Sequence, residues 1–542
     1  MSAPFAPAPI APAKPRVRHL AGSWSPIPQA QDTAHAAASR TDSALEHWYP
    51  PAGSADTDLL PDLELLRARG RDLTRNNGYA AGADQTFCDN VIGHQLRLQA
   101  QPDHTLLGWD RAKAKAWAKN TEHEFQTWWA APEEIDAAAT LDGLGLSILA
   151  ISAWFQSGEA IAIPHWKPRT GTRWNTRVQI IEADRIETPP RFASNPNIRD
   201  GKLIDEFGAP VGFFVRATHP GHTLNLGFGA FASDDYRYIP AYTRWGRRRV
   251  IHLYDVRRPE QSRGKSILAS VMREFSMGSQ YPRVELESTI RSSLISAFLS
   301  SDLSQEAAER LFADSNTYDD ASAAWVANLK NTPRIQGGKI IPLPLGARIE
   351  GFNPGRPNQA FEPFMTSVLR NIAAGLNMPY ELIAKDFSKT NYSSARSALL
   401  EAWRYFNGRR AWLARAWLTP LYELWLEEAI NASRVEAPDY YQNRYAYRRC
   451  VWQMSGRGWV DPKNEAVAAT TRLGANLTTL QQECLEQGLD YETVLEQRAE
   501  EMQLMRELNL ETKSVATPPI AGQTPDRDDD NPESSDDDRQ AA

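Results

Sequence analysis

The segment Arg263-Gly264-Lys265-Ser266 has the residue types of a phosphate-binding loop, in which backbone amides and a lysine surround a phosphate group. That chemistry also requires a glycine five residues before the glycine of the Gly-Lys pair, and this chain has Pro259 there. No apolar strand leads directly into the segment. We therefore interpret it as a loop that ends in a helix N-cap at Ser266.

Other arrangements of catalytic or metal-binding residues are also missing from the sequence. The ten histidines show no His-Glu-x-x-His pattern or other metal spacing, and no Gly-x-Ser-x-Gly nucleophile motif occurs. We expect surface or hydrogen-bonded histidines at the predicted strand and turn positions His94, His219, His222 and His252. The cysteines are too few and too scattered for a disulfide framework or a metal site, which indicates a reducing compartment: Cys88, Cys450 and Cys484. The sequence thus predicts no catalytic residue, no metal site and no cofactor.

The high tryptophan content leaves one enzymatic alternative open. Seventeen tryptophans could suit a sugar-binding cleft, and spacing alone does not exclude a glycosidase pair of carboxylates on separate elements. The alternative function is therefore a cytosolic carbohydrate-active hydrolase. However, Trp403, Trp417 and Trp425 occur at helical spacing, which favours packing in a core or between subunits.

The charge of the chain is concentrated at one end. The net charge is −7, but residues 521–542 contain eight acids and two bases, so the remaining residues carry 59 acids and 58 bases. A nearly neutral body lacks the positive charge of a tight nucleic-acid binder, and no helix-turn-helix pattern is recognised, which argues against a sequence-specific DNA-binding protein. No run of 18 apolar residues occurs, and the first residues do not resemble a secretory signal, so we expect no membrane partner.

The 542 residues are enough for two or more domains, and hydrophobic periodicity predicts their elements. Helical patterns precede and follow a region of short alternating runs separated by turn residues, which predicts an antiparallel β region at Glu159–Tyr254. The fold class is therefore α+β. The expected helices are 59–76, 79–91, 110–129, 132–155, 266–293, 359–376, 393–430 with a kink at Pro420, and 462–510. The expected strands outside the β region are 95–99, 338–343 and 347–352.

One polar segment, Asp386–Leu400, stands between two long helical patterns. It contains no histidine, cysteine or acid pair, so it has no visible catalytic chemistry. A segment this polar between helices this apolar is expected to form a loop on the surface.

Several stretches of the chain, taken in order, resemble the portal proteins of tailed bacteriophages, of the lambda type. The most similar stretch is Arg370–Leu382, which runs into Asp386-Phe387-Ser388 and Asn391–Arg396. The other matching stretches are Arg71–Asn77 with Asp89–Gly93, Arg177–Arg185, and Val250–Tyr254 through Gln261–Gly264. Together they cover roughly residues 60–510 in the order of the family.

The resemblance implies a portal fold that is mainly helical, with an antiparallel β wing region, a helical stem, a small α/β clip and a helical crown, assembled as a ring. The parts it implies are a disordered arm 1–58, a wing 59–262, a stem helix 263–293, a clip 294–356, a stem helix 357–380, a tunnel loop 381–392, a long kinked helix that returns to the wing 393–461, a crown 462–512 and a disordered acidic tail 513–542.

The resemblance also implies a function without catalytic chemistry. It implies a ring of twelve copies at one capsid vertex, the conduit through which double-stranded DNA is packaged and ejected without sequence specificity. Its further partners would be the terminase large subunit, a head–tail adaptor protein, the major capsid protein and the scaffold. The protein would be located in the virion after assembly in the cytoplasm of the bacterial host.

Within this resemblance, the loop at 385–392 is the candidate DNA-channel loop. Its residues are Lys385, Lys389, Thr390, Asn391 and Tyr392. A strongly basic wall would bind many phosphates and stall a moving duplex, whereas one or two lysines per copy would contact it weakly and reversibly. The arginines of the helix that follows are expected to form ion pairs between subunits: Arg396, Arg404, Arg409, Arg410 and Arg415.

Overall fold

The structure is a computed structural model that describes residues 35–39, 42–45, 47–221, 236–294, 298–301, 347–350, 361–456, 458, 461–508 and 510. The chain divides into two units, residues 1–54 and residues 55–542. In the first unit the described element is a single 3-10 turn, Ala36–Ala38. The second unit contains all other elements. The expected strand 338–343, most of the expected clip, the acidic tail 513–542 and His222 lie outside the described residues.

The second unit begins with a group of helices that starts earlier than the sequence predicts. Helix α1 (Ala55–Leu59) precedes a 3-10 turn (Leu60–Asp62), α2 (Leu63–Asn76) and α3 (Gly78–Val91). The carboxylate of Asp56 accepts a hydrogen bond of 2.8 Å from the backbone N–H of Ser262, which fixes α1 to the distant chain. Asn77 ends α2 and caps α3, because its side-chain oxygen accepts hydrogen bonds from the N–H groups of Tyr79 and Ala80.

The next helices include one departure from the sequence prediction. Strand β1 (Leu96–Ala100) and helix α4 (Arg111–Trp129) lie where they were expected. The helix expected at 132–155 is instead two helices, α5 (Pro132–Ile135) and α6 (Gly143–Ser157). The carboxylate of Asp136 accepts hydrogen bonds from the backbone N–H groups of three nearby residues, so it stabilises a loop in place of a helical turn: Ala138, Thr140 and Leu141.

Two antiparallel sheets confirm the expected β region. Strands β2 (Glu159–Trp166), β3 (Thr176–Ile181) and β8 (Ile251–Tyr254) form one sheet in the order β3-β2-β8. The other sheet has the order β4-β5-β6-β7, from the strands Ile198–Arg199, Lys202–Ile204, Pro210–Arg216 and Tyr236–Pro240.

Strand β2 is buried on both faces because its side chains alternate between two cores. Ala160 and Ala162 belong to the large core formed with the helices, whereas Ile161 and Ile163 belong to a smaller core. The smaller core also contains Phe213 of β6, so it connects the two sheets. This alternation explains why β2 reads as an almost continuous apolar run.

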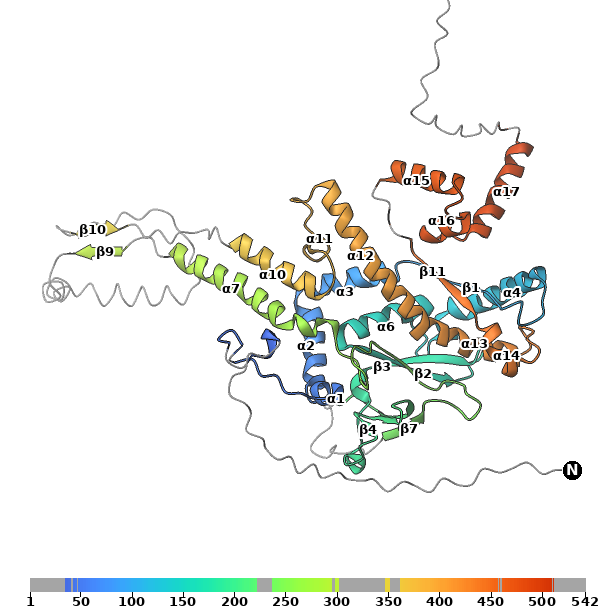
Figure 1. The fold of residues 1–542 in the computed structure, drawn as a ribbon, viewed down its shortest axis with the longest axis horizontal. Helices are drawn as coiled ribbons and strands as arrows, with labels where there is room; N and C mark the ends of the chain where they lie inside the picture. Colours follow the sequence, from blue (N-terminus) through green and yellow to red (C-terminus); the bar gives the residue numbers. More distant parts are fainter. Residues whose placement is uncertain are drawn as a thin grey trace, which may run out of the picture. The chain divides into compact units, whose positions relative to one another are not determined.

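Helix α7 (Met272–Leu294) leaves the sheets and packs beside α10 (Phe361–Gly375), as Figure 1 shows. The rings of Tyr281 and Phe361 are stacked across this contact with centroids 5.6 Å apart. Between the two helices, β9 (Phe298–Ser301) pairs with β10 (Ala347–Glu350) in antiparallel fashion. The strand expected at 347–352 is therefore confirmed as far as Glu350.

The long helix expected after the polar segment is present, but its boundaries and its irregular point differ. After the short α11 (Tyr380–Ala384), α12 (Tyr392–Leu413) continues through a π-helical turn (Ala414–Leu418) into α13 (Thr419–Asn431). More than half of the segment Asp386–Leu400 is therefore helix and not loop. Pro420 lacks an N–H and its ring crowds the carbonyl four residues earlier, at Ala416. The π turn widens the helix at that carbonyl, so the irregularity lies before Pro420.

The last part of the chain packs against its first part through a pair of strands. Helix α14 (Tyr440–Tyr447) leads into β11 (Cys450–Met454), which pairs with β1. Helices α15 (Pro462–Gly474), α16 (Leu480–Glu486) and α17 (Tyr491–Glu507) follow. Among the described helices, none has the length and apolar character that crossing a membrane requires.

The tryptophans confirm the prediction of core packing. Trp417 and Trp425 are fully buried, and Trp403 is partly buried against the same core. The ring of Phe125 lies at the centre of an aromatic cluster, with ring centroids 5.2 to 5.9 Å from those of Trp129, Tyr422, Trp425 and Trp452. These rings fill the space between α4, α13 and β11.

Candidate functional site

The candidate loop begins at Lys385, which ends α11 in the left-handed conformation with φ of +56°. Its side-chain amine donates a hydrogen bond to the hydroxyl of Thr86 on α3. The start of the loop is thus fixed to a helix about 300 residues earlier in the chain, and Lys385 is held by the protein at its charged end.

Lys389 is the most exposed cation of the loop, and it has an acidic partner. Its amine pairs with the carboxylate of Glu362 on α10, and the two side chains are 75% and 72% exposed. The hydrogen bond to Glu362 raises the pKa of Lys389, so this lysine remains charged. Next to it, Asp386 accepts hydrogen bonds from the hydroxyl and the N–H of Ser388, which lower the pKa of Asp386.

The end of the loop is a helix cap. The hydroxyl of Thr390 donates to the carboxylate of Glu381 over 3.2 Å, and the side-chain oxygen of Asn391 accepts from the N–H of Ser394 over 2.8 Å. Tyr392 is the first residue of α12. Asn391 therefore serves as the N-cap that turns the loop into the long helix.

The five predicted residues lie on one short stretch, from the end of α11 to the first residue of α12, that is held by α3, α10 and α11. Within the described part of the loop, the charged groups are two lysines and Asp386, and the arrangement offers no acid–base or nucleophilic chemistry. The two anchors, Thr86 and Glu362, were missed by sequence reasoning because nothing local in the sequence indicates which distant helices meet the loop.

Sequence reasoning also missed a network of buried charges at the start of β2. Glu159 is fully buried, and its carboxylate accepts hydrogen bonds from the guanidinium of Arg263 (2.7 Å), from His252 Nε2 (2.7 Å) and from Arg67. The backbone N–H of Gly264 adds a further hydrogen bond of 3.2 Å. One carboxylate thus holds α2, β8 and the segment before α7 together.

The pKa values within this network follow from burial and from the neighbouring charges. Burial alone would raise the pKa of Glu159, but the charges of Arg263 and Arg67 and the hydrogen bond from His252 hold it well below its usual range. Burial lowers the pKa of His252 to about 4, because the charged ring would lose its hydration, and this effect outweighs the hydrogen bond to Glu159, which raises the pKa. His252 is therefore a neutral donor to a charged carboxylate.

The segment that has the residue types of a phosphate-binding loop is part of this network. Gly158 and Gly264 approach each other so closely that a Cβ on Gly264 would lie 2.1 Å from the carbonyl oxygen of Gly158. The hydroxyl of Ser266 accepts from the N–H of Leu268 over 3.1 Å, which confirms the predicted N-cap. Arg263 and Gly264 are thus required by packing and not by a phosphate.

The predicted histidine roles are confirmed where the structure describes them. His94 contacts the hydroxyl of Ser455, and His252 contacts Glu159.

His219 lies near Glu182 and Asp184, a combination that could hold a metal ion. However, Nδ1 of His219 accepts a hydrogen bond from Gly221, so the proton of the neutral ring is on Nε2, the atom that faces Glu182 at 2.8 Å. Asp184 is already paired with Arg71 at 2.6 Å, so this group does not fit a metal.

Two of the arginines expected between subunits have partners within their own chain. Arg409 pairs with Asp255 at 2.9 Å, and Arg410 donates to the backbone oxygen of Asn90 over 2.7 Å. For these two residues the expectation has to be corrected, because their guanidinium groups connect α12 to the rest of the subunit.

Comparison with known proteins gives consistent matches. The profile of the family described as "Phage portal protein, lambda family" matches residues 41–410. The chain is 28% identical over 497 residues to portal protein B of Escherichia phage lambda, with 89% of this chain and 91% of that protein covered. It is 28% identical over 472 residues to the portal protein of Escherichia phage N15, with 84% of this chain and 87% of that protein covered.

Among solved structures, a chain from the neck of an empty gene transfer agent particle, computed with C6 symmetry, matches at 12% identity and a TM-score of 0.42. The match covers 79% of this chain and 94% of that one. The family profile spans well over half of the sequence, and two relatives align along almost their whole length. The chain therefore belongs to the lambda family of phage portal proteins.

Proposed function

We propose that this protein forms a ring of twelve copies at one capsid vertex and that the ring is the conduit for double-stranded DNA during packaging and ejection. The observation that carries the proposal is the match to the family along residues 41–410, together with two relatives that are named portal proteins. The ring would dock the terminase large subunit and later the head–tail adaptor protein, and it would contact the major capsid protein and the scaffold. The protein would be located in the virion after assembly in the host cytoplasm.

In this proposal the parts of the subunit have separate roles. Residues 59–262 form the wing, and α7 and α10, which pack side by side in Figure 1, form the stem. Residues 294–356 between these helices form the clip, which faces the motor and the adaptor. Helices α15 to α17 form the crown inside the capsid. No catalytic chemistry is assigned to the chain, and the force for packaging comes from a separate ATPase.

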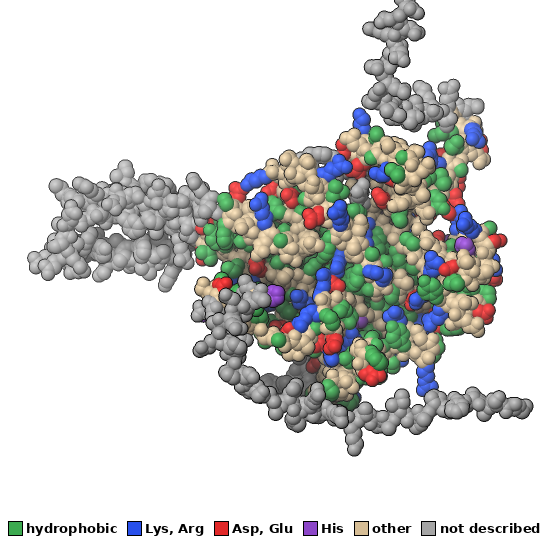
Figure 2. Space-filling model, viewed as in Figure 1, with side chains coloured by type: hydrophobic (Ala, Val, Ile, Leu, Met, Phe, Trp, Pro, Cys, Tyr) green, Lys and Arg blue, Asp and Glu red, His purple; other side chains and the backbone are tan. Residues whose placement is uncertain are grey.

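The loop at 385–392 lines the channel in this proposal. Its support is the mild charge of the loop: Lys389 is exposed but already shares its charge with Glu362. On the face shown in Figure 2, basic and acidic side chains are interspersed over the described surface. Such a wall would contact phosphates without retaining them, since each strong lysine or arginine contact adds to the affinity for DNA and would slow a moving duplex.

The first test is the mass of the assembly. Twelve chains of 60.7 kDa give a closed ring of roughly 0.7 MDa, which native mass spectrometry or mass photometry can resolve. Electron micrographs should show a central hole. A protein that remains monomeric under all conditions and turns over substrates from a glycoside panel would instead support the hydrolase alternative.

The second test concerns the loop. The double variant Lys389→Gln, Tyr392→Ala should form normal rings but package or retain less DNA. The matched control is Lys119→Gln, since Lys119 is also an exposed lysine paired with an acid, Glu496, but lies on α4. If packaging and retention by the loop variant equal those of the control, the loop does not line the channel.

A third test concerns the acidic tail. Truncation after Ile520 should leave ring assembly intact, because the net charge of −6 that it removes lies outside the portion of the chain that matches the family profile. Loss of rings in the truncated protein would contradict this expectation.

A further inference from the structure

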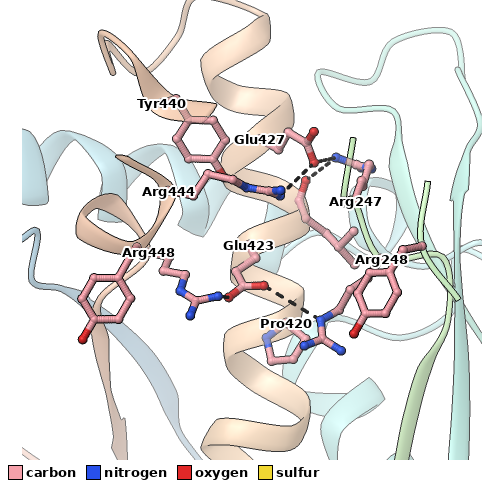
Figure 3. A pocket seen from close by; sticks show the side chains of 12 residues that line it. Arg247, Arg248, Pro420, Glu423, Glu427, Tyr440, Arg444 and Arg448 are labelled. Carbon is pink, nitrogen blue, oxygen red and sulfur yellow. Dashed lines mark hydrogen bonds and ion pairs between the residues drawn. The ribbon is translucent and has the colours of Figure 1, made fainter. Parts of the chain in front are cut away.

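A hollow of about 310 Å³ lies where α13, α14 and the turn after β7 meet. We call its charged lining the arginine groove, which consists of Arg247, Arg248, Glu423, Glu427, Arg444 and Arg448. In Figure 3 the two glutamates lie on α13 in the middle, and arginines approach them from both sides. None of the groove residues belongs to the loop at 385–392, and the proposed function does not use the groove.

The groove contains more positive than negative charge. Each glutamate is shared by two arginines, one at a short distance and one at a long distance. Arg448 is 2.8 Å from Glu423, whereas Arg248 is 4.0 Å from it. Arg247 is 3.0 Å from Glu427, whereas Arg444 is 3.8 Å from it. Two carboxylates thus oppose four guanidinium groups, which leaves an excess of two positive charges.

Aromatic rings lie against three arginines of the groove: Arg248, Arg444 and Arg448. The guanidinium carbon of Arg248 is 5.4 Å from the centroid of the Tyr242 ring. For Arg444 the distance to the Tyr440 ring is 5.7 Å, and for Arg448 the distance to the Tyr445 ring is 5.6 Å. A guanidinium held by a ring loses less conformational freedom when it binds an anion, so the groove is organised before any ligand arrives.

A second hollow extends the same positive surface. It has a volume of about 440 Å³ and shares Arg248, Glu423 and Arg448 with the first. It adds Arg415 and Arg449, of which Arg449 is paired with Asp103 at 2.6 Å. Across both hollows six arginines face three carboxylates, which leaves a net charge of +3 in a subunit whose body is close to neutral.

The chemistry of this surface suits a run of carboxylates. The guanidinium fork matches a carboxylate with two parallel hydrogen bonds, and Arg248 and Arg448 are still 38% and 45% exposed. A DNA duplex is too wide to enter hollows of this volume, so its phosphates could reach only the rim. Carboxylates on a peptide can enter one at a time.

We propose that the arginine groove binds the acidic segment at the end of this chain, residues 521–542. That segment has eight acids and two bases, and six of the acids form the runs Asp528–Asp530 and Asp536–Asp538. Its two aspartate runs are dense clusters of negative charge, and the arginine groove is their complement. The described chain reaches Leu510, and the 16 residues from there to Asp526 can span at most about 55 Å. The donor of the segment is the same subunit or a neighbouring copy.

The experiment measures binding of a fluorescein-labelled synthetic peptide of residues 521–542 by fluorescence anisotropy. The full-length chain should bind it weakly because its own segment occupies the groove. A full-length variant with Asp replaced by Asn at positions 528, 529, 530, 536, 537 and 538 should bind the peptide at least 10-fold more tightly. Raising the salt concentration should weaken this binding, because the contacts are between charges.

The groove is tested by substitutions in the background with the neutral segment. Arg444→Gln with Arg448→Gln should weaken peptide binding at least 10-fold. Arg248→Gln alone removes an arginine whose ion pair with Glu423 is long, at 4.0 Å, so it should weaken peptide binding about 3-fold while leaving the thermal unfolding unchanged. The control removes two charges elsewhere, Arg75→Gln with Arg472→Gln, and should leave peptide binding unchanged.

Three outcomes would overturn the proposal. The first is equal peptide binding by the unmodified chain and the chain with the neutral segment, which would show that the segment does not occupy the site. The second is equal loss in the groove variants and in the control. The third is a short DNA duplex that displaces the peptide at a lower concentration than unlabelled peptide does, which would make the groove a phosphate site.

Discussion

Glu159 and Glu362 each accept hydrogen bonds from basic side chains, but in opposite surroundings. Glu159 is fully buried among Arg263, Arg67 and His252, whereas Glu362 and Lys389 form an exposed pair at the candidate loop. A buried carboxylate without its partners would be left uncompensated in a medium of low polarity, whereas an exposed one is solvated by water. Ion pairing therefore fixes the fold around Glu159, whereas the exposed pair of Glu362 and Lys389 can open and exchange partners.

This difference agrees with the role proposed for the loop. The Glu159 network joins α2, β2, β8 and the segment before α7, so a break in it would loosen the connection between the sheets and the helices. The pair at the loop can open at little cost, which suits the proposal that Lys389 contacts a passing phosphate and then returns to Glu362.

The largest effect is expected for Glu159→Gln. The substitution leaves Arg263 and Arg67 buried without their negative partner, which should cost about 3 to 5 kcal/mol in the free energy of unfolding. Urea unfolding followed by circular dichroism measures the change. The matched control is Glu362→Gln at the exposed pair, for which we expect an unchanged unfolding midpoint. Equal midpoints for the two variants would remove the contrast.

The second prediction concerns pH. The pKa of His252 falls from 6.5 to about 4 on folding, so below pH 6.5 the unfolded chain binds a proton that the folded chain does not. The free energy of unfolding is therefore not reduced by His252 above pH 6.5. As the pH falls from 6.5 toward 4, it decreases by on the order of 3 kcal/mol. Glu159 acts in the same direction below its unfolded pKa, because folding lowers its pKa as well.

Urea unfolding at pH 7.5, 6.5, 5.5 and 4.5 measures this dependence. The control is His252→Gln, which keeps an N–H donor toward Glu159 but has no titrating ring. The loss of stability between pH 6.5 and 4.5 should be clearly smaller in this variant. If the two proteins lose stability in parallel, the acid sensitivity arises from other groups.

The third prediction concerns the helix cap at the loop. Asn391→Ala removes the acceptor for the N–H of Ser394 and should cost about 1 kcal/mol in the free energy of unfolding. Asn391→Ser keeps a side-chain oxygen at the same position and should restore most of the loss. Hydrogen exchange of the first amides of α12 should increase in the alanine variant alone. Equal exchange in both variants would show that the side chain does not cap the helix.

The smallest effect is expected for Lys389→Gln alone. The variant removes one partner of an exposed pair, so the urea midpoint and the ring mass should not change. If the midpoint falls as it does for Glu159→Gln, the loop is part of the stable framework and does not contrast with the buried network.

Much of the fold could be predicted from periodicity, because buried helices and strands repeat their apolar residues. The alternation at Arg177–Ile181 and Val250–Tyr254 predicted β3 and β8, and Ser266 was predicted as a cap. The break between α5 and α6 could not be predicted, since it depends on hydrogen bonds from backbone N–H groups to one carboxylate, that of Asp136.

The loop residues could be named from the sequence, but their partners could not. Lys385 contacts Thr86, which is 299 residues away, and no local pattern contains that information. Arg263 is the opposite case. Its segment has the residue types of a phosphate-binding loop, but Gly264 is explained by its close approach to Gly158 and Ser266 by its cap on the N–H of Leu268. The arginine groove was missed since its arginines come from two separate segments of the chain.

The pairing of β1 with β11 delays part of the folding during synthesis, because β1 cannot pair until β11 has been made. Leu96 pairs with Met454, 358 residues later in the chain. At about 5 to 20 residues per second, the ribosome needs roughly 20 to 70 s to make the second strand after the first. During that interval β1 lacks its partner strand, and the aromatic residues of α4 lack their partners from α13 and β11. A nascent subunit therefore cannot complete this part of its core until most of its length has emerged, so the proposed ring can be built only from nearly complete chains.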